Sequence, residues 1–291
     1  MSKLNRRTTL GGLLALGAAA ACRAPAKPDP HREGRAADAS GAADRSAPPA
    51  ALVRVIQAED KIEGDGATVR RLFPTRQLPN LDPFVLLDDF DVRQPAGFPM
   101  HPHRGFEAFT YMIDGAFHHR DTMGNDSVIG PGGTQRFTSG RGARHSEMPA
   151  TAGSNRGLQL WVNLPQRLKK IDPTYAGVDG SAMPIVREAG TTLREIVGEL
   201  SPVELQTEVR YHDLELEPGC EFSAVIPEGH NALLYVMNGE LRAFDQSFSR
   251  GAGLLPSAGR IDVRTEAGAR FVLLSGRPHG EPIRHRGPFV D

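Results

Sequence analysis

From Leu52 onward the chain is a series of short apolar runs separated by turn-forming residues, spaced at roughly ten residues. The clearest runs are "FVLLDDF", "FEAFTYMI", "LQLWVNL", "ALLYVMNGEL" and "RFVLLSG". The composition agrees, since 32 glycines and 23 prolines interrupt the 291 residues, and only 6% of them are aromatic. Helical periodicity is weak, with one short turn or helix expected near Leu164 to Tyr175. The pattern predicts an all-β protein of the sandwich or barrel type.

The two halves of this series resemble each other. "FEAFTYMIDGAF" in the first half corresponds to "HNALLYVMNGEL" in the second, and each contains a turn dipeptide, Asp114-Gly115 or Asn238-Gly239. We therefore predict a duplicated β-barrel, with residues 51–165 forming the first barrel and residues 191–291 the second. The stretch 166–190 leaves the strand rhythm and is interpreted as the connection between them.

Two segments of the first half carry candidate metal ligands. In an extended chain side chains alternate between faces, so His101 and His103 point the same way, and Glu107 shares their parity. In a second extended segment His145 and Glu147 repeat this two-residue spacing. A single His-x-His could arise by chance on a solvated strand edge. Chance is a poorer explanation once a second same-face pair follows. The two pairs together indicate a metal site between neighbouring strands.

Around the corresponding strand of the second half no His-x-His or His-x-Glu pair occurs. His230 is the only histidine near the corresponding strand, and we interpret it as a surface loop residue. The sequence therefore predicts one metal ion per chain, held by the first barrel.

The N-terminal residues read as a processing signal. Residues 1–22 begin with a basic segment containing Arg6-Arg7 and continue as a short apolar run, too short for a stable membrane-spanning helix. They resemble a twin-arginine export signal and predict a periplasmic location, although Asn5, Thr9 and Gly11 depart from its usual pattern. Cys22 follows three alanines, so a lipid anchor at Cys22 and simple cleavage near the alanine run both stay open.

Residues 23–50 contain almost no large apolar side chain and are expected to form a disordered tether. The only cysteines are Cys22 and Cys220, and because one lies in the expected signal, no internal disulfide is expected. The formal net charge of -1 gives no support for nucleic-acid binding. We expect a monomer that acts on a small molecule.

Four motifs give the chain from about Leu52 to Val290 a specific resemblance to the pirins, a family of the cupin superfamily. They are "HPHRGFE", "SGRGARHSEMP", "GLQLWVNLP" and "SGRPHGEPIRHRGPFV". The resemblance implies two tandem cupin barrels and a single mononuclear iron in the first. By motif, the implied ligands are His101, His103, His145 and Glu147, with Glu107 in a supporting position behind them.

The segment "PGGTQRFTSG" departs from the pirin pattern, because Gly133 and Arg136 replace an acidic residue and a large aromatic one. We expect this change to alter the pocket wall and not the ligands. His118 and His119 are expected on a hairpin surface, and Arg104 is expected to face away from His103 in an ion pair or loop anchor.

Three imidazoles and one carboxylate suit a divalent first-row ion such as Fe(2+), and in a six-coordinate ion they leave about two positions free. The residues themselves leave Zn, Mn, Ni and Cu open.

The resemblance implies a dioxygenase that acts with O2 on a quercetin-like flavonol or another enolic substrate, with Glu147 or Glu107 as the catalytic base. One alternative is a metal-dependent, redox-responsive protein-interaction module. Another is a metal-binding barrel without turnover.

Overall fold

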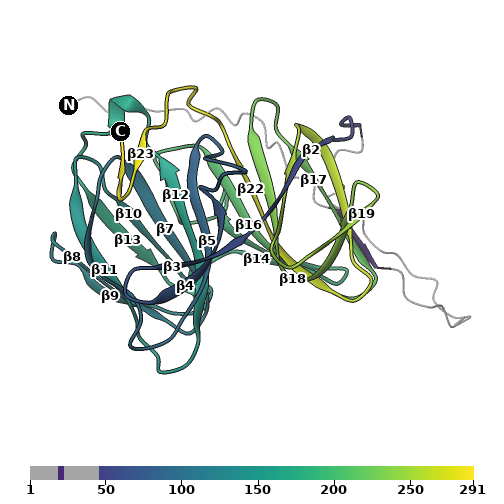
Figure 1. Cartoon of the computed structure of the whole chain (residues 1–291). Helices are drawn as coiled ribbons and strands as arrows, with labels where there is room; N and C mark the ends of the chain where they lie inside the picture. Colours follow the sequence, from purple (N-terminus) through teal and green to yellow (C-terminus); the bar gives the residue numbers. More distant parts are fainter. Residues whose placement is uncertain (1–18, 23–45) are drawn as a thin grey trace, which may run out of the picture.

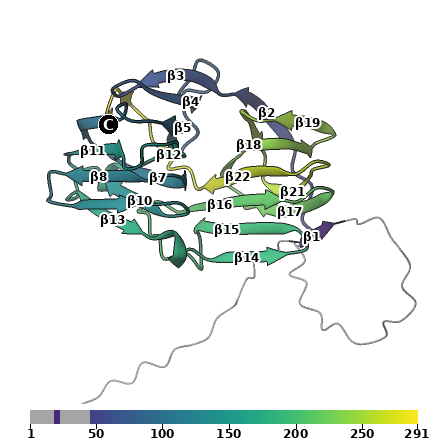
Figure 2. The ribbon, with the colours of Figure 1, turned by 90° about the horizontal axis from the view of Figure 1, so that it is seen from below.

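The computed structural model describes residues 19–22 and 46–291, and it is built almost entirely of β-strands. Two barrels lie side by side, the first drawn in blue to teal and the second in green to yellow (Figures 1 and 2). The helical elements of the described part are two 3-10 turns, η1 (Gln166–Leu168) and η2 (Gly180–Ala182). This confirms the predicted all-β fold of two barrels and the short helical turn. Within the described ranges no helix has the length and apolar character needed to span a membrane.

The first barrel consists of a seven-stranded and a four-stranded antiparallel sheet. The larger sheet has the order β13-β10-β7-β12-β5-β4-β3 and the smaller the order β6-β11-β8-β9. The bounds are β3 (Glu59–Glu63), β4 (Ala67–Phe73), β5 (Phe84–Val92), β6 (Phe98–His103), β7 (Phe106–Asp114), β8 (Phe117–Asp121), β9 (Asp126–Ile129), β10 (Thr134–Thr138), β11 (Ala143–Pro149), β12 (Asn155–Asn163) and β13 (Thr174–Val178).

The second barrel is formed by an eleven-stranded sheet whose main path is β1-β17-β21-β18-β22-β16-β15-β14, with β2, β19 and β20 attached to it. A two-stranded hairpin, β23 with β24, ends the chain. The bounds are β1 (Ala19–Cys22), β2 (Leu52–Gln57), β14 (Ile185–Glu188), β15 (Thr191–Val197), β16 (Val209–Leu216), β17 (Cys220–Ile226), β18 (Asn231–Ala243), β19 (Gln246–Ser249), β20 (Ala252–Pro256), β21 (Gly259–Arg264), β22 (Ala269–Gly276), β23 (His285–Arg286) and β24 (Phe289–Val290).

The two turn dipeptides do not form simple hairpins. Gly115 (φ +67°) leads from β7 in the larger sheet of the first barrel to β8 in the smaller one. Asn238-Gly239 lies inside β18, beside a register shift between Val236 and Asn238, and Gly239 has φ +73°. Glycine tolerates this left-handed conformation, so at both places the chain bends from one side of its barrel to the other.

The ends of the chain are exchanged between the barrels, which differs from the predicted boundaries. β2, expected in the first barrel, lies on the second barrel (Figure 1), where it pairs with β20. Val290 is fully buried in an apolar cluster of the first barrel, although the final residues were assigned to the second. The expected connection also contains paired strands, since β13 extends the first barrel and β14 the second. Sequence rhythm could not reveal these exchanges, because each joins segments far apart in the chain.

The barrels are held together by an extensive apolar interface in which two tyrosines cross reciprocally. Tyr111 of the first barrel donates its hydroxyl hydrogen to Asp213 of the second at 2.6 Å, and Tyr235 of the second donates to Asp89 of the first at 2.7 Å. Tyr111 and Tyr235 occupy corresponding places in the duplicated motif. Because one face of β7 meets this interface and the other lines the barrel, β7 is buried from Phe106 to Met112.

The N-terminal predictions lie largely outside the described residues. Of the expected tether, residues 46–50 are described, and Pro49 forms a β-bridge with Arg260 of the second barrel. Strand β1 places Cys22 opposite Cys220 in register. Cys220 is disulfide-bonded, so the expectation of no internal disulfide is wrong. That expectation treated residues up to 22 as separate from the fold, whereas β1 pairs with β17.

Candidate metal centre

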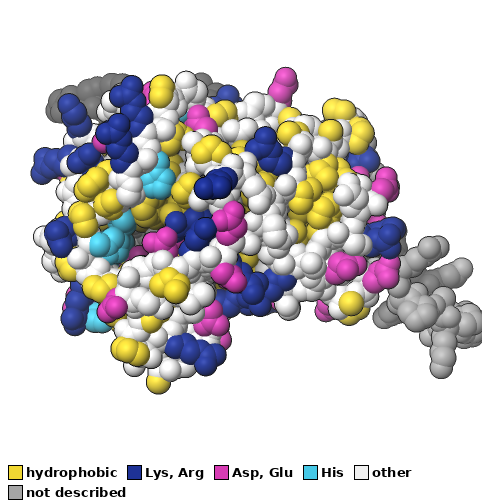
Figure 3. All heavy atoms as spheres, viewed as in Figure 1, with side chains coloured by type: hydrophobic (Ala, Val, Ile, Leu, Met, Phe, Trp, Pro, Cys, Tyr) yellow, Lys and Arg dark blue, Asp and Glu magenta, His cyan; other side chains and the backbone are white. Residues whose placement is uncertain are grey.

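A cavity of about 760 Å³ occupies the interior of the first barrel. Both sheets contribute to its wall, as do the loop after β3 and the segment that contains β23. Histidine side chains reach the surface of this barrel among hydrophobic and charged groups (Figure 3). The lining residues are Glu63, Gly64, Asp65, Val69, Arg71, Leu86, Asp88, Phe90, Phe98, Pro99, His101, His103, Phe117, Glu147, Gln159, Trp161, His285, Gly287 and Pro288.

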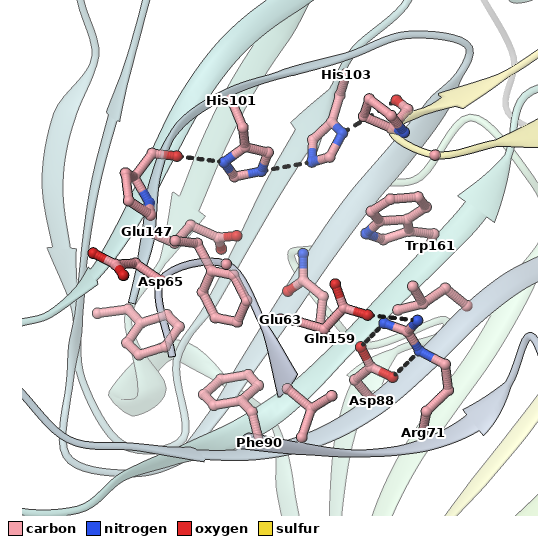
Figure 4. A pocket seen from close by; sticks show the side chains of 18 of the residues that line it. Glu63, Asp65, Arg71, Asp88, Phe90, His101, His103, Glu147, Gln159 and Trp161 are labelled. Atoms are coloured by element: carbon pink, nitrogen blue, oxygen red, sulfur yellow. Dashed lines mark hydrogen bonds and ion pairs between the residues drawn. The ribbon is translucent and has the colours of Figure 1, made fainter. Parts of the chain in front are cut away.

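His101 and His103 share one face of β6, as the alternation predicted, and their rings point into the cavity (Figure 4). Nδ1 of His101 lies 2.7 Å from the Pro99 carbonyl oxygen, and Nδ1 of His103 lies 3.3 Å from that of Pro288. A carbonyl oxygen only accepts, so each Nδ1 carries the ring hydrogen and each Nε2 keeps a free lone pair. The two Nε2 atoms are only 2.9 Å apart. Two lone pairs at this distance repel each other unless a cation lies between them.

His145 completes a group of three imidazoles. One ring nitrogen from each of His101, His103 and His145 lies within 4.8 Å of the others. His145 is 1% exposed, yet neither of its ring nitrogens has a hydrogen-bond partner among the described residues. Its ring stacks on Phe137 with centroids 4.3 Å apart, which fixes its plane. An orphaned buried nitrogen beside two free lone pairs fits a metal ligand.

Burial keeps the rings of His103 and His145 neutral, the state that metal binding requires. Burial, and then the neighbouring His101, lower the pKa of His103 to about 3. Burial lowers the pKa of His145 well below its ordinary value, and His103, His101 and His119 add to this effect. Both imidazoles therefore present lone pairs near neutral pH. The donor set fits a divalent first-row ion.

Glu147 is the carboxylate that accompanies the three rings. Thr110 donates to its Oε1 at 2.6 Å, and Gln135 donates to the same oxygen. Its Oε2 lies 4.0 Å from Nε2 of His145. The side chain is therefore oriented by one oxygen and presents the other to the imidazoles.

Glu107, in contrast, does not share the face of the histidines. It is fully buried on the side of β7 that meets the second barrel, where it accepts from Thr138 Oγ1 and from the Gln206 backbone N–H, both at 2.8 Å. Thr110 of the same strand points into the cavity region instead. The parity argument fails because Gly105 (φ +87°) separates β6 from β7, which belong to different sheets. The prediction that Glu107 supports the ligands or acts as a base there is contradicted by this placement.

Three other sequence predictions also meet the structure here. Arg104 forms an ion pair with Asp291 and lies over Phe289, as expected of a loop anchor. His119 is fully buried and stacks on Tyr175 at 4.0 Å, so its assignment to a hairpin surface is wrong, whereas His118 is half-buried. Strand β8 lies between β11 and β9 in the smaller sheet, and the His119 ring is buried among the rings of Phe137, His145 and Tyr175.

Outside the cavity, His230 occupies the loop between β17 and β18 but is 7% exposed, so its ring is not on the surface as predicted. Gly133 and Arg136 are not among the residues that line the cavity. Arg136 lies 3.7 Å from Glu107 on the barrel interface, so neither residue at this departure from the pirin pattern forms part of the cavity wall.

An ion-paired cluster lies across the cavity from the imidazoles (Figure 4). Arg71 donates two hydrogen bonds to the Asp88 carboxylate, at 2.9 and 2.8 Å, and its Nη1 lies 2.8 Å from Glu63. Trp161 and Gln159 also line the wall. This cluster was not predicted from the sequence. Thr110 and Gln135, the two residues that donate to Glu147, were also missed, although their positions as polar residues among buried neighbours in β7 and β10 were a usable signal.

Residues 66–162 match the family described as Pirin, and residues 211–291 match the Pirin C-terminal cupin domain. A pirin-like protein of Solanum lycopersicum is 43% identical over 83% of this chain and 87% of its own length. The chain belongs to the pirin family. The pirin of Homo sapiens is 36% identical over 81% of this chain and 85% of its own length. The crystal structure of a quercetin 2,3-dioxygenase from Acinetobacter baumannii is 29% identical, with a TM-score of 0.78, and it covers 84% of this chain and 92% of that one. These matches confirm the expected pirin fold of two cupin barrels, with a histidine triad that could hold a metal ion.

Proposed function

We propose that this pirin is an iron(II)-dependent dioxygenase that uses O2 to cleave a flavonol or a related enolic compound. The observation that carries the proposal is the cavity, which sets three imidazoles and Glu147 against aromatic walls. Similarity to a quercetin 2,3-dioxygenase supports the class of reaction.

The cavity suits a planar hydroxylated ligand. Its volume of about 760 Å³ falls within the range typical of small-molecule sites. Phe90, Phe98 and Trp161 offer flat apolar surfaces, while Asp88 and Glu63 on the far side offer oxygen atoms that accept hydrogen bonds from hydroxyl groups. A flavonol presents both features.

Glu147 is the residue best placed to take a proton from the substrate. When bound, a divalent first-row cation would lower the pKa of a substrate hydroxyl and orient the oxygen atoms that it binds. Glu147 Oε1 is already held by Thr110 and Gln135, so Oε2 is the oxygen free to accept that proton or to bind the ion. Glu107 points to the other barrel and takes no part in the proposal.

The test is O2 consumption by the iron-loaded protein with a panel of flavonols and with flavones that lack the enolic hydroxyl. We expect uptake with flavonols alone, and its loss in Glu147→Gln. If iron is bound and no compound of the panel stimulates uptake, the dioxygenase proposal is wrong, and a regulatory or purely metal-binding role takes its place.

We also propose export by the twin-arginine route, based on Arg6-Arg7 before the short apolar run. Replacing both arginines by lysine should retain the protein in the cytoplasm. Unchanged export would remove this proposal. The mass of the mature N-terminus would distinguish simple cleavage from a lipid anchor at Cys22, and an anchor is incompatible with the disulfide because the chain has no third cysteine.

A further inference from the structure

The last residues of the chain, which we call the C-terminal segment (residues 283–291), cross from the second barrel to the first. Val290 is buried against Phe106 and Phe137 of the first barrel. Its backbone N–H donates to the Arg104 carbonyl oxygen at 3.0 Å. The segment is therefore part of the wall of the first barrel although its chain neighbours belong to the second.

Two side chains of the first barrel hold this segment. Lys169 lies after η1 and is 8% exposed, and its ammonium donates to the carbonyl oxygens of Gly105 and Val290, both at 2.9 Å, and to Asn163 Oδ1 at 2.8 Å. At the surface, the Arg104 guanidinium donates to both carboxylate oxygens of Asp291, at 2.9 and 3.0 Å. Lys169 thus uses all three of its ammonium hydrogens, and one of them binds the C-terminal segment at the Val290 carbonyl oxygen.

The segment in turn contacts the candidate metal centre. His285, Gly287 and Pro288 line the cavity, and the His285 ring lies 5.6 Å from that of Trp161. The Pro288 carbonyl oxygen lies 3.3 Å from Nδ1 of His103. An acceptor at Nδ1 selects the tautomer that leaves Nε2 free, and such contacts behind a metal ligand typically change metal affinity by about 10–100-fold.

We propose that the C-terminal segment is a positioning element for the metal centre, with Lys169 and the Arg104–Asp291 ion pair holding the Pro288 carbonyl against His103. The inference rests on the proposed metal site. By this inference, the shape of the site depends partly on residues that bind neither metal nor substrate. The second barrel thereby contributes to a centre that lies wholly in the first.

The experiment uses the full chain with two variants and a matched control. Asp291→Ala removes the exposed ion pair, and Lys169→Met removes the buried ammonium while keeping an unbranched side chain. Asp172→Ala removes the ion pair of Asp172 with Arg141, also on the first barrel and also exposed, which touches neither the segment nor the cavity. The probe is cobalt(II), measured by competition with a chelator and by its visible absorption.

We expect the cobalt dissociation constant to rise about tenfold or more in Lys169→Met and about threefold in Asp291→Ala, with no change in Asp172→Ala. Nitrogen-15 NMR of the metal-free protein provides a readout that a general loss of stability would not move. It should show His103 with its hydrogen on Nδ1 in the unaltered protein and a mixture of tautomers in the two variants.

Unchanged affinity and an unchanged His103 tautomer in both variants would overturn the positioning role while leaving the metal site intact. If Lys169→Met does not fold, Asp291→Ala at the surface decides the question by the same two measurements. A failure of the unaltered protein to bind cobalt would instead overturn the metal site itself, and with it this inference.

Discussion

The two barrels place opposite chemistry at matching positions of the same framework. In the first barrel neighbouring strands align Thr110, Gln159 and Asp88 in register, and all three side chains face the cavity or its supports. In the second barrel the corresponding strands align Leu234, Leu273 and His212. The polar row surrounds a cavity, whereas Leu234 and Leu273 belong to a continuous apolar core.

This difference shows how one duplicated fold separates binding from stability. The second core contains Phe222, Leu254 and Phe271, each buried, and a fully buried side chain of this kind contributes roughly 1.5–3 kcal/mol. The first barrel divides its apolar side chains into smaller clusters and leaves polar groups inside. The second barrel then stabilises the first through the interface and through the C-terminal segment.

The largest expected effect concerns metal binding by the two barrels. His145→Ala should lower the affinity for a divalent ion on the order of a hundredfold or more, because structural zinc sites gain about 10–16 kcal/mol from about four ligands. His212→Ala, at a buried histidine of the second barrel, should leave metal content unchanged. Elemental analysis after dialysis measures both. Two equivalents of metal in the unaltered protein would break the contrast.

Acid should lower the free energy of unfolding through His212, the histidine that lies in register with Leu273 in the second barrel. Burial, and then Arg210, lower the pKa of His212 to about 4 in the folded protein. Between the ordinary value of about 6.5 and pH 4 the unfolded chain therefore binds a proton that the folded chain does not, so acid destabilises the fold. His212 should account for a loss on the order of 3 kcal/mol in the free energy of unfolding as the pH falls from 7 to 4.

His212→Leu tests this assignment, since leucine matches the apolar core around it. Denaturant unfolding of the metal-free proteins at several pH values should give a flatter dependence for the variant. Identical pH dependence in both proteins would show that the acid response comes from other groups, with the cavity histidines the first to consider.

The sequence predicted correctly the relations between residues of one strand, and it failed where a prediction crossed the end of a strand. His101 with His103, and His145 with Glu147, were placed correctly because each pair lies within one strand, where alternation is local and reliable. Glu107 was misplaced because the same alternation was carried across Gly105. The strand rhythm likewise predicted two barrels but not which barrel receives each end of the chain.

The remaining features depend on register between distant strands. Thr110 and Gln135 meet because β7 and β10 pair at those residues, and no local pattern states that pairing. The contacts of Lys169 with Val290 and of His103 with Pro288 join positions more than 100 residues apart. The disulfide at Cys220 was missed because Cys22, the only other cysteine, was assigned to the export signal.

A tenfold or greater loss of metal affinity, or about 1.4 kcal/mol, is expected for Glu147→Gln, because an amide oxygen binds a dication more weakly than a carboxylate does. Turnover should fall further if Glu147 also accepts the substrate proton. Glu107→Gln is the matched control, since it changes the same group on the interface side of the barrel. Chelator competition measures both, and metal lost from Glu107→Gln but kept in Glu147→Gln would reverse the ligand assignment.

The smallest expected effect concerns the two reciprocal tyrosines, Tyr111 and Tyr235. Their hydrogen bonds look symmetric, but the two carboxylates that accept them have different arginine partners. Asp213 keeps a bidentate ion pair with Arg270, at 3.0 and 2.6 Å, if Tyr111 loses its hydroxyl. Among the described residues, Asp89 would keep only Arg156 and Arg250, at 3.5 and 4.0 Å, if Tyr235 loses its hydroxyl. A buried carboxylate left with poorer partners costs more than one that stays paired. Tyr235→Phe should therefore lower the free energy of unfolding by about 1.5 kcal/mol and Tyr111→Phe by only about 0.5 kcal/mol. Urea denaturation of the two variants measures the difference, and equal costs, or a larger cost for Tyr111→Phe, would mean that the arginines do not determine how the two carboxylates are satisfied.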